Sequence, residues 1–114
     1  MMPILISGTL ACDLTLGRNY SDTIYSLVLA ANTEQHFTIP AKAGKVFINI
    51  QKVNTVSYWT KIGGTGTTAA IPVANVLDGT ASSLNVPFYS LRPTDTTISV
   101  ICDGATIMTF AFYL

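Results

Sequence analysis

The residues that could support chemistry are few and scattered along the chain. His36 is the only histidine, and it stands between Gln35 and Phe37 in a stretch that alternates like a strand. A metal site needs several ligands at suitable spacing, and the sequence places no cluster of Cys, Asp or Glu around His36. No serine lies in a Gly-x-Ser-x-Gly motif, and the histidine has no evident acidic partner. We therefore expect no catalytic residue, no metal and no other cofactor, and a surface or structural role for His36.

Three acidic residues, Asp78, Asp95 and Asp103, stand beside turn-forming residues. Aspartate side chains cap turns by accepting hydrogen bonds from the backbone two residues further on, which explains these positions without catalysis. Strands can bring any two carboxylates together, so spacing alone does not exclude a glycoside-hydrolase pair. Because the chain has only six acidic residues, turn capping is our prediction.

Two other stretches could bind small ligands. The glycine-rich stretch from Gly63 to Thr68 lacks the Gly-Lys-Ser/Thr ending of a phosphate-binding loop, so a flexible loop is predicted there. Tyr58 and Trp59 are adjacent, and in a strand they point to opposite faces. One should lie in the core and one outward. An exposed Trp59 suits a protein interface or a sugar platform, and of the two we favour core or protein contact over sugar binding.

The composition of the chain limits the kinds of partner that it can bind. The 114 residues suffice for one domain with a substantial core. Hydrophobic residues make up 49% of the chain, charged residues only 11%, and the net charge is zero. A chain with so few charges tends to associate. We therefore expect it to contact copies of itself or a larger protein. The six basic residues are scattered singly and predict no nucleic-acid surface. No apolar run approaches the length of roughly 18 residues that spans a bilayer, so no membrane partner is expected.

The N-terminal residues resemble a targeting segment only weakly. Thr9 to Cys12 has a faint likeness to a lipoprotein cleavage box, but no basic residue precedes Arg18, so we expect neither a signal peptide nor a lipid anchor. Synthesis and use in a cytoplasm are the expectation. There, Cys12 and Cys102 serve as small buried apolar residues, while a disulfide between them stays open as an alternative.

Hydrophobic alternation with a period of two predicts an all-β chain. Pro3 to Leu16 has the pattern of one or two short strands. Further strands are expected over Thr23–Ala30 (with a helix as the competing interpretation), Thr33–Ile39, Lys45–Gln51, Thr55–Thr60, Phe88–Leu91, Thr96–Cys102 and Thr106–Leu114. Lys45–Gln51 and Thr55–Thr60 together form a candidate hairpin. Seven or eight short strands at this spacing are typical of a β-sandwich.

The last nineteen residues have the strongest pattern, and the chain should be organised around them. Two β-rich runs flank Asp103-Gly104, which predicts a second hairpin. In the final run, Met108, Phe110, Phe112 and Leu114 share one face, which we place in the core. A strand this apolar is unsuited to the solvent-exposed edge of a sheet. We therefore expect it to lie between two other strands.

The segment from Gly63 to Asn85 breaks the alternation. It is rich in Gly, Ser, Thr, Ala and Pro, and a connection of this length within a compact domain is usually functional or an interaction surface. Short apolar pieces at Ala70–Val73 and Val76-Leu77 are expected to dock it on the body. We therefore predict one domain over residues 1–114, with an interaction arm at 1–16 and an interaction loop at 63–85.

From about Thr33 onward the chain resembles small structural proteins of bacteriophage particles. The resemblance rests on short stretches in a characteristic order: Phe37–Gly44, Val46–Ile50, Asp78–Asn85, Thr97–Val100 and the Phe-Ala-Phe-Tyr ending. Proteins of this kind look like head-decoration, or cement, proteins with a jelly-roll-like β-sandwich. They sit on the outer capsid surface, often as dimers or trimers, and bridge neighbouring major capsid subunits.

The resemblance implies a non-enzymatic virion protein, made in the host cytoplasm, that binds the major capsid protein and itself. The runner-up is a tail-fibre or spike module that binds a host-surface glycan. A small hydrolase has no support beyond the acidic residues. The residues expected to form the interaction surface are Ile4, Leu5, Ile6, Trp59, Ile71, Val73, Val76 and Leu77.

Overall fold

The alternating stretches form eight β-strands in the computed structural model, which describes residues 23–51 and 56–114. The strands are β1 (Thr23–Leu29), β2 (Gln35–Thr38), β3 (Lys45–Ile50), β4 (Tyr58–Gly63), β5 (Ser83–Leu84), β6 (Phe88–Ser90), β7 (Thr97–Cys102) and β8 (Thr106–Tyr113). The described residues contain no helix, so the competing helical interpretation of Thr23–Ala30 is wrong. In β1 the alternation of buried and exposed side chains prevails over the helix-compatible composition.

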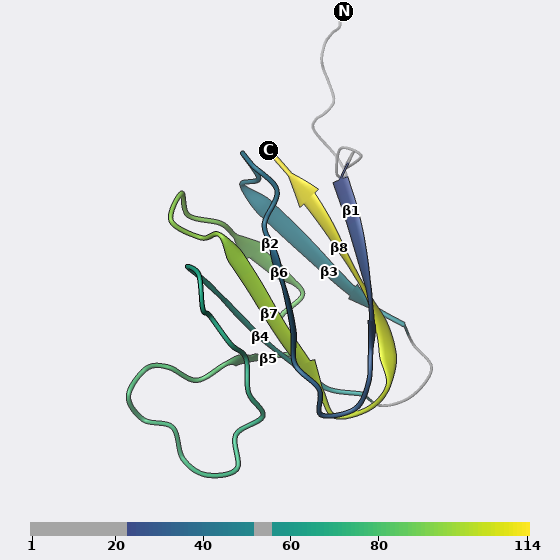
Figure 1. Cartoon of the computed structure of the whole chain (residues 1–114), viewed down its shortest axis with the longest axis vertical. Coiled ribbons are helices and arrows are strands. Elements are labelled where there is room, and N and C mark those ends of the chain that lie inside the picture. The colour runs from purple at the N-terminus through teal and green to yellow at the C-terminus, as the bar shows by residue number, and fades with distance from the viewer. Residues whose placement is uncertain (1–22, 52–55) are drawn as a thin grey trace, which may run out of the picture.

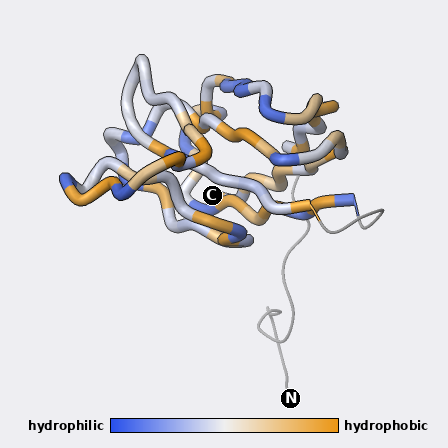
Figure 2. Tube along the Cα trace, turned by 90° about the horizontal axis from the view of Figure 1, so that it is seen from below, coloured by the Kyte–Doolittle hydropathy of each residue, from blue (hydrophilic) through white to orange (hydrophobic). Residues whose placement is uncertain are grey.

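The strands pair into two four-stranded antiparallel sheets that pack face to face. Sheet A has the order β1-β8-β3-β6, and sheet B has the order β2-β7-β4-β5. Figure 1 shows the two sheets along the length of the molecule, and Figure 2 shows the two layers from below. Apart from β4 and β5, which both lie in sheet B, successive strands alternate between the sheets, and the strand order is that of a jelly roll. The predicted all-β, jelly-roll-like sandwich is therefore confirmed.

Strand β8 lies inside sheet A, between β1 and β3, as its apolar sequence predicted. Met108, Phe110 and Phe112 point inward and are almost entirely buried. The prediction for Leu114 is wrong, because this side chain is 91% exposed. The strand ends at Tyr113, whose carbonyl accepts a hydrogen bond from the Gly44 N–H, and Leu114 follows the last strand residue.

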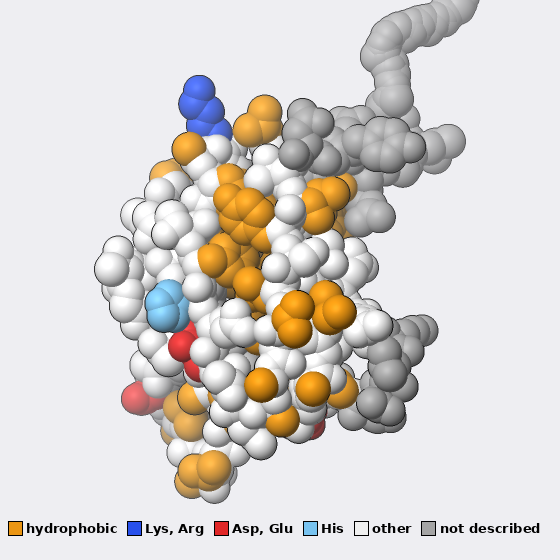
Figure 3. Space-filling model, turned by 45° about the vertical axis from the view of Figure 1, so that its right-hand side comes forward, with side chains coloured by type: hydrophobic (Ala, Val, Ile, Leu, Met, Phe, Trp, Pro, Cys, Tyr) orange, Lys and Arg blue, Asp and Glu red, His pale blue; other side chains and the backbone are white. Residues whose placement is uncertain are grey.

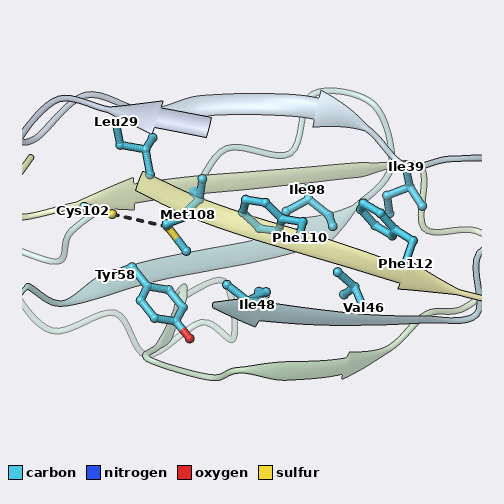
Figure 4. Packing of buried hydrophobic residues seen from close by; sticks show 11 residues of the cluster. Leu29, Ile39, Val46, Ile48, Tyr58, Ile98, Cys102, Met108, Phe110 and Phe112 are labelled. Carbon is cyan, nitrogen blue, oxygen red and sulfur yellow. Dashed lines mark hydrogen bonds between the residues drawn. The ribbon is translucent and has the colours of Figure 1, made fainter. Parts of the chain in front are cut away.

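The core lies between the inner faces of the sheets. Figure 4 shows Met108, Phe110 and Phe112 of β8 among side chains from β3, β4 and β7, with Cys102 reaching Met108 at 3.6 Å between the sulfur atoms. Aromatic rings close the side where β1 and β2 lie, and Phe37 packs edge-on against Tyr25 at 5.4 Å between ring centroids. The inner faces of β1 and β2 therefore contribute to the core.

The predicted hairpin at Asp103-Gly104 is wrong. Strand β7 belongs to sheet B and β8 to sheet A, so residues 103–105 carry the chain from one sheet to the other. The Asp103 carboxylate accepts a hydrogen bond from the Ser57 backbone N–H, and the Asp103 N–H donates to the Ser57 carbonyl. These bonds tie the turn to the start of β4 within sheet B. The inner faces of β7 and β8 thus meet across the core instead of lying side by side.

The other hairpin, predicted between Lys45–Gln51 and Thr55–Thr60, is wrong for the same reason. β3 pairs with β8 and β6 in sheet A, whereas β4 pairs with β7 and β5 in sheet B. Both strands have one strongly apolar face, and placing them in opposite sheets lets these faces bury each other. The part of this connection at residues 52–55 lies outside the described residues.

Candidate protein-interaction surface

The loop of residues 64–82, called the long loop below, joins β4 to β5 and extends away from the two sheets at the lower left of Figure 1. It is shorter than the predicted 63–85 because Gly63 and Ser83-Leu84 pair within sheet B. Its base is fixed: Ala69 is buried, and its N–H donates to the Ser99 hydroxyl at 2.7 Å. The Lys61 ammonium donates to the Thr80 carbonyl at 2.8 Å, so both arms of the loop are attached to the sandwich.

The far part of the long loop carries hydrophobic side chains in water. Val73 is 99% exposed and Leu77 is 89% exposed, while Val76 is partly exposed and Ile71 half-buried. The expectation that Ala70–Val73 and Val76-Leu77 dock on the body is therefore wrong for Val73 and Leu77, whose side chains are almost fully exposed. Ala69 provides that anchor instead, because its small side chain fits against the sheet beside Ser99. The loop thus presents a supported apolar tip.

Asp78 shapes the return of the long loop to β5. Its carboxylate accepts hydrogen bonds from the Thr80 hydroxyl at 2.6 Å and from the Thr80 N–H at 3.1 Å. The Thr80 hydroxyl bond is the main cause that lowers the pKa of Asp78. Gly79 between them has a φ of 86°, which a residue with a side chain adopts only with strain. This is the turn-capping role predicted for Asp78.

Tyr58 and Trp59 lie on opposite faces of β4, as predicted. Tyr58 is buried in the core, and its burial is the main cause that raises its pKa to about 12. Trp59 is half-buried on the outer face of sheet B, opposite Ile101 on one side and Leu84 on the other. Its neighbours are therefore aliphatic, which suits a protein contact better than a sugar platform.

The three residue types of a hydrolytic triad do meet, but in an order that cannot activate a serine. The Ser99 hydroxyl donates to the Glu34 carboxylate at 2.5 Å, and the same carboxylate lies 3.1 Å from His36 Nδ1. Glu34 thus separates the serine from the histidine, and Ser99 is fully buried beneath the long loop. A nucleophile needs direct contact with its base and access to substrate. The cluster instead fastens β2, β7 and the long loop together.

Sequence reasoning missed Glu34 as the partner of His36. The two residues are two positions apart, so they lie on the same face of a strand, which is the signal that could have identified the pair. The bond from Ser99 to Glu34 joins residues 65 positions apart and has no local signal. His36 itself points outward, as predicted, with most of its side chain exposed.

Within residues 23–51 and 56–114, neither Cys102 nor the cavity beside Thr60 provides a reactive centre. Burial raises the pKa of Cys102 to about 11, which disfavours the reactive thiolate. The described residues contain no group of three or more His, Cys, Asp or Glu that could hold a metal ion. A cavity of about 350 Å³ is lined by Thr60 and Tyr89, but neither hydroxyl oxygen is accessible from it or has a hydrogen-bond partner. A ligand in this cavity would not reach either group.

Asp95 is also structural, as predicted. Arg92 donates its backbone N–H to the Asp95 carboxylate at 2.7 Å, and its guanidinium lies 3.1 Å from the second carboxylate oxygen. Burial alone would raise the pKa of Asp95, but the bonds from Arg92 outweigh it and the pKa is lowered. Together with Thr94 and Pro93 these residues form the turn before β7.

Of the predicted interaction residues, the structure places Ile71, Val73, Val76 and Leu77 on the long loop and Trp59 on the outer face of sheet B. Ile4, Leu5 and Ile6, and Cys12 as well, lie outside the described residues. Cys102 is buried and free, which agrees with its predicted role as a small apolar core residue.

Sequence reasoning missed a second apolar surface, on the outer face of sheet A. It carries four of the exposed large hydrophobic side chains: Ile24, Val28, Phe88 and Ile107. The available signal was the outer face of Thr23–Ala30, where Ile24 and Val28 are as apolar as the inner positions.

Comparisons with models of protein families, with curated proteins and with solved structures found no match for this chain. Among the described residues, no helix is long and apolar enough to cross a membrane.

Proposed function

We propose that this chain is a non-enzymatic structural protein of a virus particle that binds the outer capsid surface and bridges neighbouring major capsid subunits. The observation that carries the proposal is the apolar tip of the long loop, where Val73 and Leu77 are almost fully exposed. The attached base of this loop, through Ala69 and Lys61, gives the tip a defined position relative to the sandwich.

Burial of the tip in a partner would release a substantial free energy. Transfer of a fully exposed Val or Leu side chain out of water stabilises a complex by about 1.5–3 kcal/mol. The hydrogen bonds that hold the arms of the loop reduce the conformational entropy lost on binding. A single contact of this size is weak, but a capsid offers many identical sites, and a protein that bridges subunits gains from multivalency.

The architecture agrees with this role at the level of analogy. Jelly rolls are common in the capsid proteins of viruses and also in lectins, so the topology supports a virion protein without distinguishing capsid binding from glycan binding. The aliphatic surroundings of Trp59 favour a protein partner over a glycan. The buried Ser99 and the central position of Glu34 count against a hydrolase.

The test uses particles of the virus whose genome encodes the chain, with and without the protein. Particles that lack it should release their DNA at lower temperature, because unbridged subunits resist internal pressure less well. The double variant Val73→Ser/Leu77→Ser should co-sediment with these particles at least tenfold more weakly than the unmodified protein, while its circular dichroism stays unchanged.

The matched control is Leu114→Ser, which removes an equally exposed hydrophobic side chain far along the chain from the loop. This variant should bind the particles normally. Equal binding by the loop variant would show that the tip is not the contact. Equal heat stability of particles without the protein, together with binding of the purified chain to a host glycan, would replace the proposal with the fibre-module alternative.

A further inference from the structure

The outer face of sheet A has a regular pattern that follows from strand register. Residues from neighbouring strands align in three rows across the sheet. The first row is apolar and consists of Ile24, Ala111, Phe47 and Phe88. The second row is polar but uncharged and consists of Ser26, Thr109 and Asn49. The third row is again mainly apolar and consists of Val28, Ile107 and Gln51. The pattern therefore reads apolar–polar–apolar along the strands.

Four of the hydrophobic side chains in these rows are exposed to solvent, and Phe47 and Ala111 are half-buried. Val28 is 74% exposed, Ile24 57% and Ile107 40%. Figure 3, with the side formed by β1 and β8 turned toward the viewer, shows hydrophobic groups across this side and most charged groups near its left-hand and lower margins. Among the described residues of sheet A, Lys45 is the one charged side chain that points outward, and it lies beyond the first row.

The aromatic part of this face is already ordered within one molecule. The Phe47 ring lies 4.6 Å from Phe88 and 5.6 Å from Tyr113, measured between ring centroids. Rings that pack against each other in this way lose little further freedom when a partner covers them. The face is thus organised for contact before any partner binds.

We propose that this face is covered by the same face of a second copy of the chain, related by a two-fold axis that runs along the polar row. This rotation exchanges the first and third rows, so Ile24 lies over the partner's Val28, and Ala111 lies over the partner's Ile107. The polar row meets itself. The proposal concerns a different surface from the long loop and does not depend on particle binding.

The pattern selects a second copy over an unrelated apolar partner. The middle row carries hydroxyl and amide groups that both donate and accept hydrogen bonds, and an identical row supplies matching partners. An apolar surface would leave them unsatisfied, at a cost comparable to the gain from the flanking rows. Two identical faces with zero charge in their three rows also meet without electrostatic repulsion.

The position of Lys45 selects the direction of the axis. Rows are about 6.7 Å apart along a strand, so an axis along the polar row places the two Lys45 positions roughly 27 Å apart. An axis along β8 would also place apolar rows on apolar rows. It would, however, bring the two Lys45 positions to about 10 Å from each other along the sheet, where two ammonium groups still repel each other. The axis along the polar row avoids this repulsion.

The size of the face predicts a weak dimer. The three rows hold four, three and three residues and cover about 300 Å² in each copy, or roughly 600 Å² in both. This area lies below that of a standard stable interface, so dissociation constants in the micromolar range are expected.

The experiment is sedimentation equilibrium of the full chain from about 1 to 500 µM, which brackets that range. The unmodified chain should form a dimer. Ile24→Glu and Val28→Lys should each weaken dimerisation at least tenfold, because each places a charge opposite a hydrocarbon side chain of the partner. Leu77→Lys, which changes an even more exposed hydrophobic residue outside the face, should dimerise normally.

The double variant Ile24→Glu/Val28→Lys tests the axis itself. In one chain the two positions are two rows, or about 13 Å, apart, so the introduced charges do not pair within a molecule. Across the proposed axis each introduced carboxylate meets one ammonium of the partner, so the dimer gains two such pairs, and dimerisation should recover toward that of the unmodified chain. Circular dichroism of all variants checks that the fold is retained.

A monomer throughout this range would overturn the proposal, as would normal dimerisation of both single variants. Failure of the double variant to recover would overturn the axis along the polar row, and so would a trimer. The chain's own residues 1–22 are the other candidate cover. A monomer whose β1 and β8 amides lose protection from hydrogen exchange when residues 1–22 are removed would assign the face to them.

Discussion

The outer faces of the two sheets differ although the sheets have the same number of strands and share one core. On sheet B the long loop covers part of the outer face, so Thr97 and Ser99 are buried there, and Ser99 binds both Glu34 and the loop. On sheet A the corresponding face keeps Ile24 and Val28 in solvent. The outer face of sheet B is thus partly covered by its own chain, whereas the outer face of sheet A keeps hydrophobic side chains exposed.

The largest expected effect concerns the core that supports both faces. Phe110→Ala should lower the free energy of unfolding by about 3–5 kcal/mol, because the residue is fully buried and the cavity left behind would refill only in part. Urea denaturation measures this loss. Thr109→Ala, the adjacent residue on the open face, is the matched control and should change the value by less than about 0.5 kcal/mol. Similar losses for both variants would show that the open face is not separate from the core.

Alkaline pH should act on the inner side of sheet B. The pKa of Cys102 rises from 9.0 to about 11, and that of Tyr58 rises from 10.0 to about 12, mainly through burial. A group whose pKa is higher in the folded state contributes its full stability below its unfolded pKa. That contribution disappears as pH rises to the folded pKa. Each group therefore accounts for at most about 2–3 kcal/mol, lost from pH 9 to 11 for Cys102 and from pH 10 to 12 for Tyr58.

The measurement is urea denaturation at pH 8, 9, 10 and 11. Cys102→Ala should be less stable at pH 8 because of the smaller side chain, but its stability should fall less between pH 9 and 11. Tyr58→Phe should remove the part that begins near pH 10. An unchanged pH profile in both variants would mean that neither group controls the alkaline transition.

The local sequence was sufficient to predict the strands and their inner faces. Period-two alternation identified Met108, Phe110 and Phe112 as buried, and the high hydrophobicity of this run placed β8 inside a sheet. Asn32 lies in the turn before β2, and its φ of 56° is of the kind that asparagine tolerates well. These features depend on neighbours in sequence, so one sequence contains enough information.

Strand pairing was not predictable in the same way. A short turn such as residues 103–105 has the same composition whether it joins neighbours in one sheet or crosses to the other. The choice depends on contacts distant in sequence, such as the one between Ser57 and Asp103. Both predicted hairpins failed for this reason.

The candidate surfaces were predicted in part. The break in alternation identified the long loop, but Val73 and Leu77 were expected to dock on the body and are exposed instead. The anchor through Ala69 was missed because it depends on Ser99, which is 30 residues away. The open face of sheet A was missed because the three rows become visible only when β1, β8 and β3 are aligned in register.

The smallest expected effect compares the two outer faces directly. Ser99→Ala removes the hydroxyl that accepts from the Ala69 N–H and donates to Glu34, so a buried amide and a part-buried carboxylate lose their partner. We expect a loss of about 1–2 kcal/mol in the free energy of unfolding. The loop should also become more susceptible to limited proteolysis, because its attachment is weakened. Thr109→Ala on the outer face of sheet A, over which the described part of the chain places no loop, should change neither property in dilute solution. If both variants behave alike, the long loop does not stabilise sheet B, and the contrast between a covered and an open face has no energetic basis.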